Sequence, residues 1–212
     1  MFDIEYKGGN TVVIATKKNT LVIDPKMSIH KGEKDFVVKN ATELATEDRF
    51  LTQSDDFALS LSYPGSYEVG DFSINGFAEK RHIDSNDEQK SVIYIIDVLG
   101  AKTGLLGNIG PELSDDQLEN LGILDILILP VGGNGYTLDA TSAAKIARNS
   151  DAKVIIPVHY AEDGINYEVP QNSLDIFIKE LGADVEKTSK YKVKNISNFP
   201  EKMTIVHIER TK

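Results

Sequence analysis

The spacing of apolar residues changes character near residue 106. Before this point, short apolar or alternating runs are separated by turn residues such as Gly8-Gly9-Asn10, a pattern typical of β-strands. Strands of this kind bury their apolar faces only by pairing into sheets that pack against another layer. The runs predict strands over residues 2–6, 11–15, 20–24, 36–39, 57–62, 72–75 and 91–97.

After this point, predicted helices alternate with strands. Ser114 and Gln117 form a capping box, Asp139 opens a second helix, and Asn172 or Ser173 opens a third. Apolar runs predict strands over residues 124–129, 154–156 and 203–209. No segment is rich in Pro, Gly or Ser in the manner of a linker. The sequence therefore predicts one domain over residues 1–212, with an α/β or α+β architecture of sheets covered by helices.

The composition argues against several functional classes. The 212 residues include 33 Asp and Glu against 23 Lys and Arg, which gives a net charge of −10 and argues against a general nucleic-acid binder. With no Cys, the chain has no disulfides, thiolate zinc sites or Cys nucleophile. No apolar run approaches the ~18 residues of a membrane span, and the N-terminus lacks a signal-peptide pattern. We expect a cytoplasmic protein whose partner is a small molecule or another protein.

Five short segments follow one another along the chain. They are Asp24-Pro25 at the end of a strand, Tyr63-Pro-Gly-Ser-Tyr-Glu-Val69, Leu105-Leu-Gly-Asn-Ile-Gly110, Asp125-Ile-Leu-Ile-Leu-Pro-Val-Gly-Gly133 and Lys153-Val-Ile-Ile-Pro-Val-His-Tyr160. In this order they resemble the metallo-β-lactamase fold, specifically its small branch of zinc-dependent hydrolases. Each motif is short, and their order makes the resemblance specific.

The resemblance implies a four-layer αββα sandwich with a metal site at one edge. In this family imidazoles and carboxylates hold one or two zinc ions, and bound water becomes the nucleophile. The hallmark is H-x-H-x-D-H after an early strand. A later His, an Asp in a Gly-Asp turn and a final His in a Pro-x-His-Tyr segment complete the ligands.

Most of these ligands are replaced. Counting back from Pro64 without gaps, the hallmark falls on residues 43–48, which offer Glu43, Ala45, Glu47 and Asp48. A shifted register over residues 53–58 supplies no better set. The Gly-Asp turn reads Gly107-Asn108, and an early Gly-His pair common in this branch reads Gly8-Gly9.

Two histidines remain as candidate ligands. His159 occupies the position of the final ligand, and its alternative, which the sequence favours, is a structural histidine with satisfied hydrogen bonds at a sheet edge. His82 lies one residue from the position of the middle histidine, where Arg81 stands, and a solvated surface role is its alternative. The chain has four histidines, whereas a two-metal site of this family uses about five imidazoles. His30 and His207 match no ligand position.

The acidic residues have two interpretations. Glu43, Glu47 and Asp48 have the i, i+4, i+5 spacing of a solvated helix face. Together with Asn108 they could instead hold a hard cation such as Mg²⁺, Ca²⁺ or Mn²⁺, which prefers oxygen ligands.

The sequence thus favours a non-catalytic binding or interaction module with a degenerate metal site and no cofactor. The alternative is a hydrolase with an altered, carboxylate-rich site for one Zn²⁺, Mn²⁺ or Mg²⁺, built from Asp48, Glu47, His82 and His159. A hydrolase without metal is a third class, for which no nucleophile is apparent, and no catalytic residue is assigned.

Overall fold

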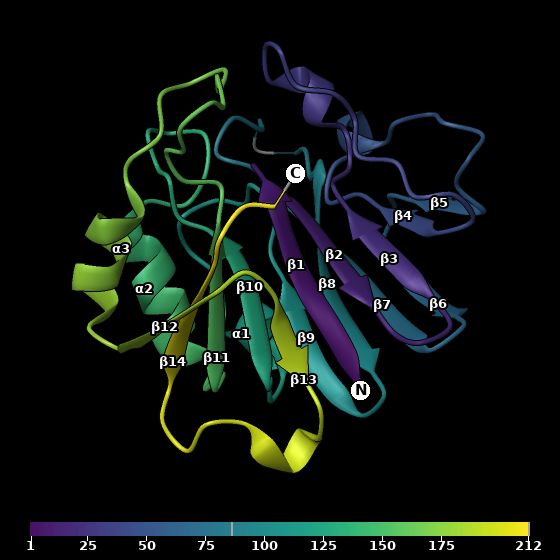
Figure 1. Ribbon diagram of the computed structural model, residues 1–212. Coiled ribbons are helices and arrows are strands. Elements are labelled where there is room, and N and C mark those ends of the chain that lie inside the picture. The colour runs from purple at the N-terminus through teal and green to yellow at the C-terminus, as the bar shows by residue number, and fades with distance from the viewer. Residues whose placement is uncertain (86, 212) are drawn as a thin grey trace.

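The computed structural model describes residues 1–85 and 87–211 and contains two β-sheets packed face to face (Figure 1). The six-stranded sheet has the order β13 (Tyr191–Val193), β1 (Phe2–Gly8), β2 (Thr11–Ala15), β3 (Thr20–Ile23), β4 (Thr42–Leu44) and β5 (Leu59–Leu61). The eight-stranded sheet has the order β12 (Asp184–Thr188), β14 (Thr204–Ile208), β11 (Val154–Val158), β10 (Ile126–Pro130), β9 (Ala101–Leu105), β8 (Ser91–Val98), β7 (Phe72–Glu79) and β6 (Gly65–Val69). The predicted layered α/β fold is confirmed.

Three helices follow the parallel strands of the eight-stranded sheet: α1 (Asp115–Leu121), α2 (Ala140–Asn149) and α3 (Leu174–Leu181). The predicted caps are present, because Ser114 and Gln117 form the capping box of α1 and the Asp139 side chain accepts from two backbone amides at the start of α2. Figure 1 places all three helices on the side of β10, β11 and β12, away from β1 to β5.

The main core lies between the two sheets, where alternate side chains such as Ile4, Ile14 and Leu21 meet Ile74 and Tyr94. The outer face of the six-stranded sheet has its own small apolar cluster. Val13 and Val22 are covered there by loop side chains rather than by a helix: Phe36, Val38, Ala41 and Phe57.

Two local predictions are wrong. Residues 36–39 form no strand; Phe36 and Val38 are apolar because they cover the outer face of the sheet from a loop. Glu43, Glu47 and Asp48 do not share a helix face. Residues 42–44 form β4, which pairs in parallel with β3 and β5, and a 3-10 turn begins only at Asp48. The helical spacing of the three acids is therefore coincidental, and they point to different places.

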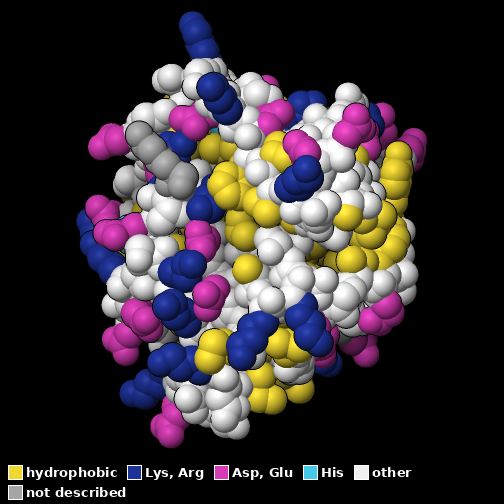
Figure 2. Space-filling model, turned by 45° about the vertical axis from the view of Figure 1, so that its right-hand side comes forward, with side chains coloured by type: hydrophobic (Ala, Val, Ile, Leu, Met, Phe, Trp, Pro, Cys, Tyr) yellow, Lys and Arg dark blue, Asp and Glu magenta, His cyan; other side chains and the backbone are white. Residues whose placement is uncertain are grey.

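Among the described residues, no helix combines the length and apolar character that crossing a membrane requires. Figure 2 shows the face that carries β4, β5 and β6 turned toward the viewer. Lys and Arg alternate there with Asp and Glu, hydrophobic side chains are exposed between them, and histidine is barely visible.

Candidate functional site

The candidate site lies where the ends of β3 and β4 approach the loop after β9. Asp24 follows β3 in a left-handed conformation, with φ of 45°. Its carboxyl accepts from the Thr46 backbone N at 2.6 Å and from Thr46 Oγ1 at 2.7 Å, which ties the ends of the two strands together. Burial raises the pKa of Asp24 to about 7, although both Thr46 hydrogen bonds oppose that change.

Thr46 also sets the distance between the two sheets at this edge. A Cβ on Gly107 would lie 2.5 Å from Thr46 Oγ1, so only glycine allows this approach. The contact brings Asn108, the next residue, to Glu47, and Asn108 Nδ2 donates to Glu47 Oε1 at 3.0 Å.

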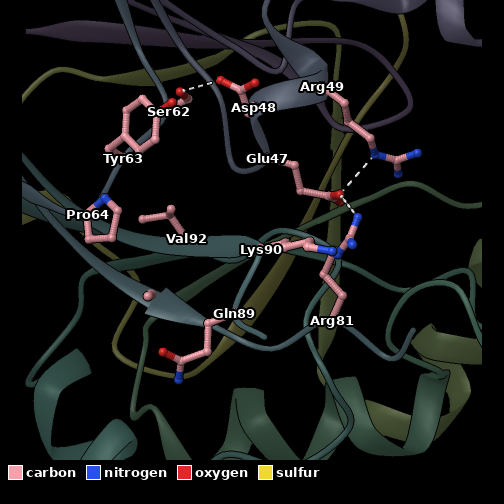
Figure 3. A pocket seen from close by; sticks show the side chains of 11 residues that line it. Glu47, Asp48, Arg49, Ser62, Tyr63, Pro64, Arg81, Gln89, Lys90 and Val92 are labelled. Atoms are coloured by element: carbon pink, nitrogen blue, oxygen red, sulfur yellow. Dashed lines mark hydrogen bonds and ion pairs between the residues drawn. The ribbon is translucent and has the colours of Figure 1, made fainter. Parts of the chain in front are cut away.

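Glu47 lies between two guanidinium groups (Figure 3). Its Oε2 accepts from Arg49 Nε at 2.9 Å and from Arg81 Nη1 at 2.7 Å, and the Glu47 side chain is only 2% exposed. Each arginine has a second carboxylate: Arg81 also binds Asp84 at 2.6 Å, and Arg49 binds Glu168 at 3.3 Å. We call the set Arg49, Glu47 and Arg81 the guanidinium clamp.

A line of hydrogen bonds connects the clamp to His159. Asn10 Nδ2 donates to Asn108 Oδ1 at 3.2 Å, and Asn10 Oδ1 lies 3.0 Å from His159 Nδ1. The Glu47 carboxylate only accepts, so it orients the Asn108 amide, which in turn orients Asn10. Asn10 Oδ1 therefore faces His159 Nδ1, and because an amide oxygen only accepts, we infer that His159 carries its proton on Nδ1, which leaves Nε2 as the acceptor nitrogen.

His159 is held rigidly at the end of β11. It has a positive φ of 51°, and its backbone N donates to Gly9 O at 2.8 Å. The strained backbone costs about 1 kcal/mol for a residue other than glycine. Burial lowers the pKa of His159 to about 3, with His30 and Arg49 adding to the effect, so the imidazole is neutral at physiological pH.

His30 is the residue that the sequence did not indicate. It is 3% exposed, and its ring lies 6.0 Å from the His159 ring and 4.8 Å from the Tyr167 ring. A Cβ on Gly9 would lie 2.8 Å from His30 Nε2, so this imidazole fills the space that a side chain at residue 9 would occupy. In the sequence, the Gly8-Gly9 pair is the feature that could have indicated this close approach of another side chain. Burial also lowers the pKa of His30.

The remaining predicted site residues lie elsewhere. Glu43 is fully buried on the outer face of the six-stranded sheet, where Thr52 and Ser60 donate to its carboxylate. Asp48 is exposed at the cavity beside the clamp and accepts from Ser62 Oγ at 3.0 Å. His82 lines a different cavity, of about 840 Å³, beside the start of α1. The structure thus brings together Glu47, Asn108 and His159 of the six candidates.

A cavity of about 410 Å³ opens beside the guanidinium clamp (Figure 3). One side comes from the loop after β4 and the other from the segment before β8 and from the end of β5. The cavity is lined by Glu47, Asp48, Arg49, Ser62, Tyr63, Pro64, Ala78, Arg81, Gln89, Lys90 and Val92.

The family follows from comparison with known proteins. The family model described as the beta-lactamase superfamily domain matches residues 3–159. The chain belongs to this family. No curated protein matches the sequence. Like this chain, the similar solved structures have the metallo-β-lactamase fold.

Three solved structures illustrate the likeness in fold. The first is a protein from Thermotoga maritima described as a "putative zn-dependent hydrolase of the metallo-beta-lactamase superfamily", with a TM-score of 0.77, 22% identity and full coverage of both chains. Igni18, a metallo hydrolase from Ignicoccus hospitalis, has a TM-score of 0.61 at 15% identity, covering 99% of this chain and 95% of its own. YhfI from Bacillus subtilis, a metallo-beta-lactamase fold protein, has a TM-score of 0.59 at 10% identity, covering 99% and 97%.

The donor atoms of this chain do not fit the metal ions that metallo-β-lactamase chemistry uses. Both oxygens of Glu47 accept hydrogen bonds, and two fixed positive charges lie against it. Both polar atoms of Asn108 and the Nδ1 of His159 are also engaged. Within residues 1–85 and 87–211, no three His, Asp or Glu side chains lie close enough together to share an ion. A zinc site needs three or four such donors around one point.

Proposed function

We propose that this protein is a non-catalytic member of the metallo-β-lactamase family that binds a small molecule or a protein segment at the cavity beside the guanidinium clamp. The observation that carries the proposal is the position of Glu47 between Arg49 and Arg81. A guanidinium group is permanently charged and cannot activate water as a Lewis acid. The two guanidinium groups neutralise the buried Glu47 carboxylate, a task that a metal ion could otherwise perform.

The wider scaffold supports a retained binding role. Asp24 and His159 have strained backbones with positive φ, and Gly107 allows the two sheets to approach closely at Thr46. Strain of this kind persists where the surrounding structure fixes it, and it is common at functional sites. The net charge of −10 favours partners other than nucleic acid, and the cysteine-free composition is compatible with a cytoplasmic location.

Metal content tests the proposal. The purified protein is dialysed separately against Zn²⁺, Mn²⁺ and Mg²⁺ near 1 mM, and bound metal and the melting temperature are measured. We expect less than stoichiometric metal and no rise in melting temperature. His159→Asn is the matched variant, because asparagine tolerates a positive φ and can still hydrogen-bond Asn10.

Stoichiometric uptake that disappears in His159→Asn would contradict the proposal. It would instead support the alternative, a hydrolase with an altered single-metal site. Phosphodiester, lactone and ester substrates then form the first panel for activity.

A further inference from the structure

We propose that the cavity beside the guanidinium clamp binds an organic ammonium ion with an apolar body. This inference rests on the proposed binding function and names the chemical class of its ligand. Three features of the cavity carry it: an uncompensated carboxylate, cations that are already paired, and an exposed aromatic ring.

Asp48 provides the uncompensated charge. Its side chain is exposed at the cavity, and its Oδ1 accepts from the Ser62 hydroxyl at 3.0 Å. In the part of the chain that the structure describes, no Lys, Arg or His lies within ion-pair distance of Asp48. Ser62 is buried and fixes the orientation of the carboxylate, so Oδ2 remains available to a ligand.

The cations around the cavity are engaged with carboxylates. Arg49 and Arg81 share Glu47 and each bind a second acid, and Lys90 Nζ lies 2.7 Å from Glu88. The cavity itself is lined by three cationic side chains, Arg49, Arg81 and Lys90, and by two carboxylates, Glu47 and Asp48. Three further carboxylates outside the lining, Asp84, Glu88 and Glu168, pair with these cations. Each lining cation therefore has an acidic partner, which disfavours an anionic ligand, and Asp48 is the lining charge left for a cation.

Tyr63 supplies an exposed aromatic surface at the same cavity as Asp48. The residue is 67% exposed, and among the exposed large apolar side chains of the described residues it is the only aromatic one. Its carbonyl oxygen accepts from the hydroxyls of Tyr67 at 3.0 Å and Tyr94 at 3.3 Å, so the backbone that carries the ring is fixed. A tyrosine face attracts cations and packs against apolar groups.

The rest of the lining suits the apolar part of such a ligand. Pro64, Ala78 and Val92, which also line the cavity, have hydrocarbon side chains. A volume of about 410 Å³ lies in the usual range for small-molecule sites. An ammonium group on Asp48 would place the attached hydrocarbon against Tyr63 and these residues.

Calorimetric titration with three probes that share a phenylethyl body tests the inference. The probes are 2-phenylethylammonium, 3-phenylpropionate and 2-phenylethanol, added to the full chain at low ionic strength. We expect the ammonium probe to bind about tenfold more tightly than the alcohol, as one charge-assisted hydrogen bond implies, and the carboxylate probe to bind most weakly.

The variant Asp48→Asn should abolish the preference for ammonium, because asparagine still accepts from Ser62 but carries no charge. Asp55→Asn removes the same charge from an exposed position outside the cavity and should leave the preference unchanged. Tyr63→Ala should weaken the ammonium and alcohol probes alike. Melting temperatures establish that each variant is folded.

Four results would overturn the inference: no binding of the ammonium probe, tighter binding of the carboxylate probe, a preference that survives in Asp48→Asn, or a loss as large in Asp55→Asn. None of them bears on metal content. A failure of the ammonium site therefore leaves the non-catalytic proposal standing, and a failure of that proposal shows separately as stoichiometric metal uptake.

Discussion

Replacing Glu47 by Gln tests the guanidinium clamp most sharply. In the native protein the carboxylate accepts three hydrogen bonds, two of them from guanidinium groups, while 2% exposed. A Gln carbonyl can still accept from both arginines, but each bond loses its charge assistance, which costs about 1 kcal/mol per bond. The new amide NH₂ then faces the Asn108 NH₂, and two donors cannot pair.

This conflict is removed if the donor and acceptor directions along the hydrogen bonds from residue 47 to His159 reverse. If Asn108 and Asn10 both flip, each donor again meets an acceptor, and the proton of His159 moves from Nδ1 to Nε2. Reversal limits the loss to about 2 kcal/mol, whereas an unsatisfied donor pair adds about 1–3 kcal/mol. We therefore expect Glu47→Gln to lower the free energy of unfolding by about 2–5 kcal/mol.

Thermal unfolding measures this loss, which corresponds to a fall in melting temperature of about 4–20 °C for a chain of this length. Nitrogen-15 spectra of the histidine side chains report the tautomer of His159. Glu88→Gln is the control, because it neutralises one carboxylate of an exposed pair with Lys90 and should leave the melting temperature unchanged. A Glu47→Gln protein as stable as the wild type, with His159 still protonated on Nδ1, would refute the reasoning.

Three further predictions concern the same site. Burial gives His159 a folded pKa of about 3, against about 6.5 in the unfolded chain. Its contribution to stability is therefore present above pH 6.5 and is lost as the pH falls toward 3. In His159→Asn, the slope of the unfolding free energy against pH should fall over this interval by up to about 1.4 kcal/mol per pH unit. The pH dependence from Asp24 has the opposite sign, because its folded pKa is raised to about 7 and the unfolding free energy therefore falls as the pH rises from about 4 to 7. In urea titrations over that interval, the stability of Asp24→Asn should rise relative to that of the wild type. Gly107→Ala should lower the free energy of unfolding by about 1–3 kcal/mol, because its methyl group would meet Thr46 at 2.5 Å; an unchanged urea midpoint would contradict the close approach.

The sequence predicted the parts of the fold that have strong local signals. The capping residues of α1 and α2 and the apolar runs of β10 and β11 are local features, and the structure confirms them. The strand β4 was missed because it contains the buried acid Glu43, which is unusual in a strand. Its carboxylate is satisfied by Thr52 and Ser60, partners that lie 9 and 17 residues away and that no local pattern connects to it.

The site could be predicted only in part, for a similar reason. Motif order identified Asn108 and His159 as residues of the site, and both lie on one line of hydrogen bonds with Glu47. The roles of Arg81 and His30 depend on contacts across 34 and 129 residues of sequence, respectively, since Arg81 binds Glu47 and His30 packs against His159. Residue type at one position carries no information about such contacts, so the sequence alone predicts neither role.

Anomalous diffraction at the zinc edge, from crystals equilibrated with Zn²⁺, tests the central claim most directly. We predict that Arg49 and Arg81 remain hydrogen-bonded to Glu47, at 2.9 and 2.7 Å, with no anomalous peak between them and His159. A peak bound by His159 Nε2 and a Glu47 carboxylate that both arginines have left would contradict it.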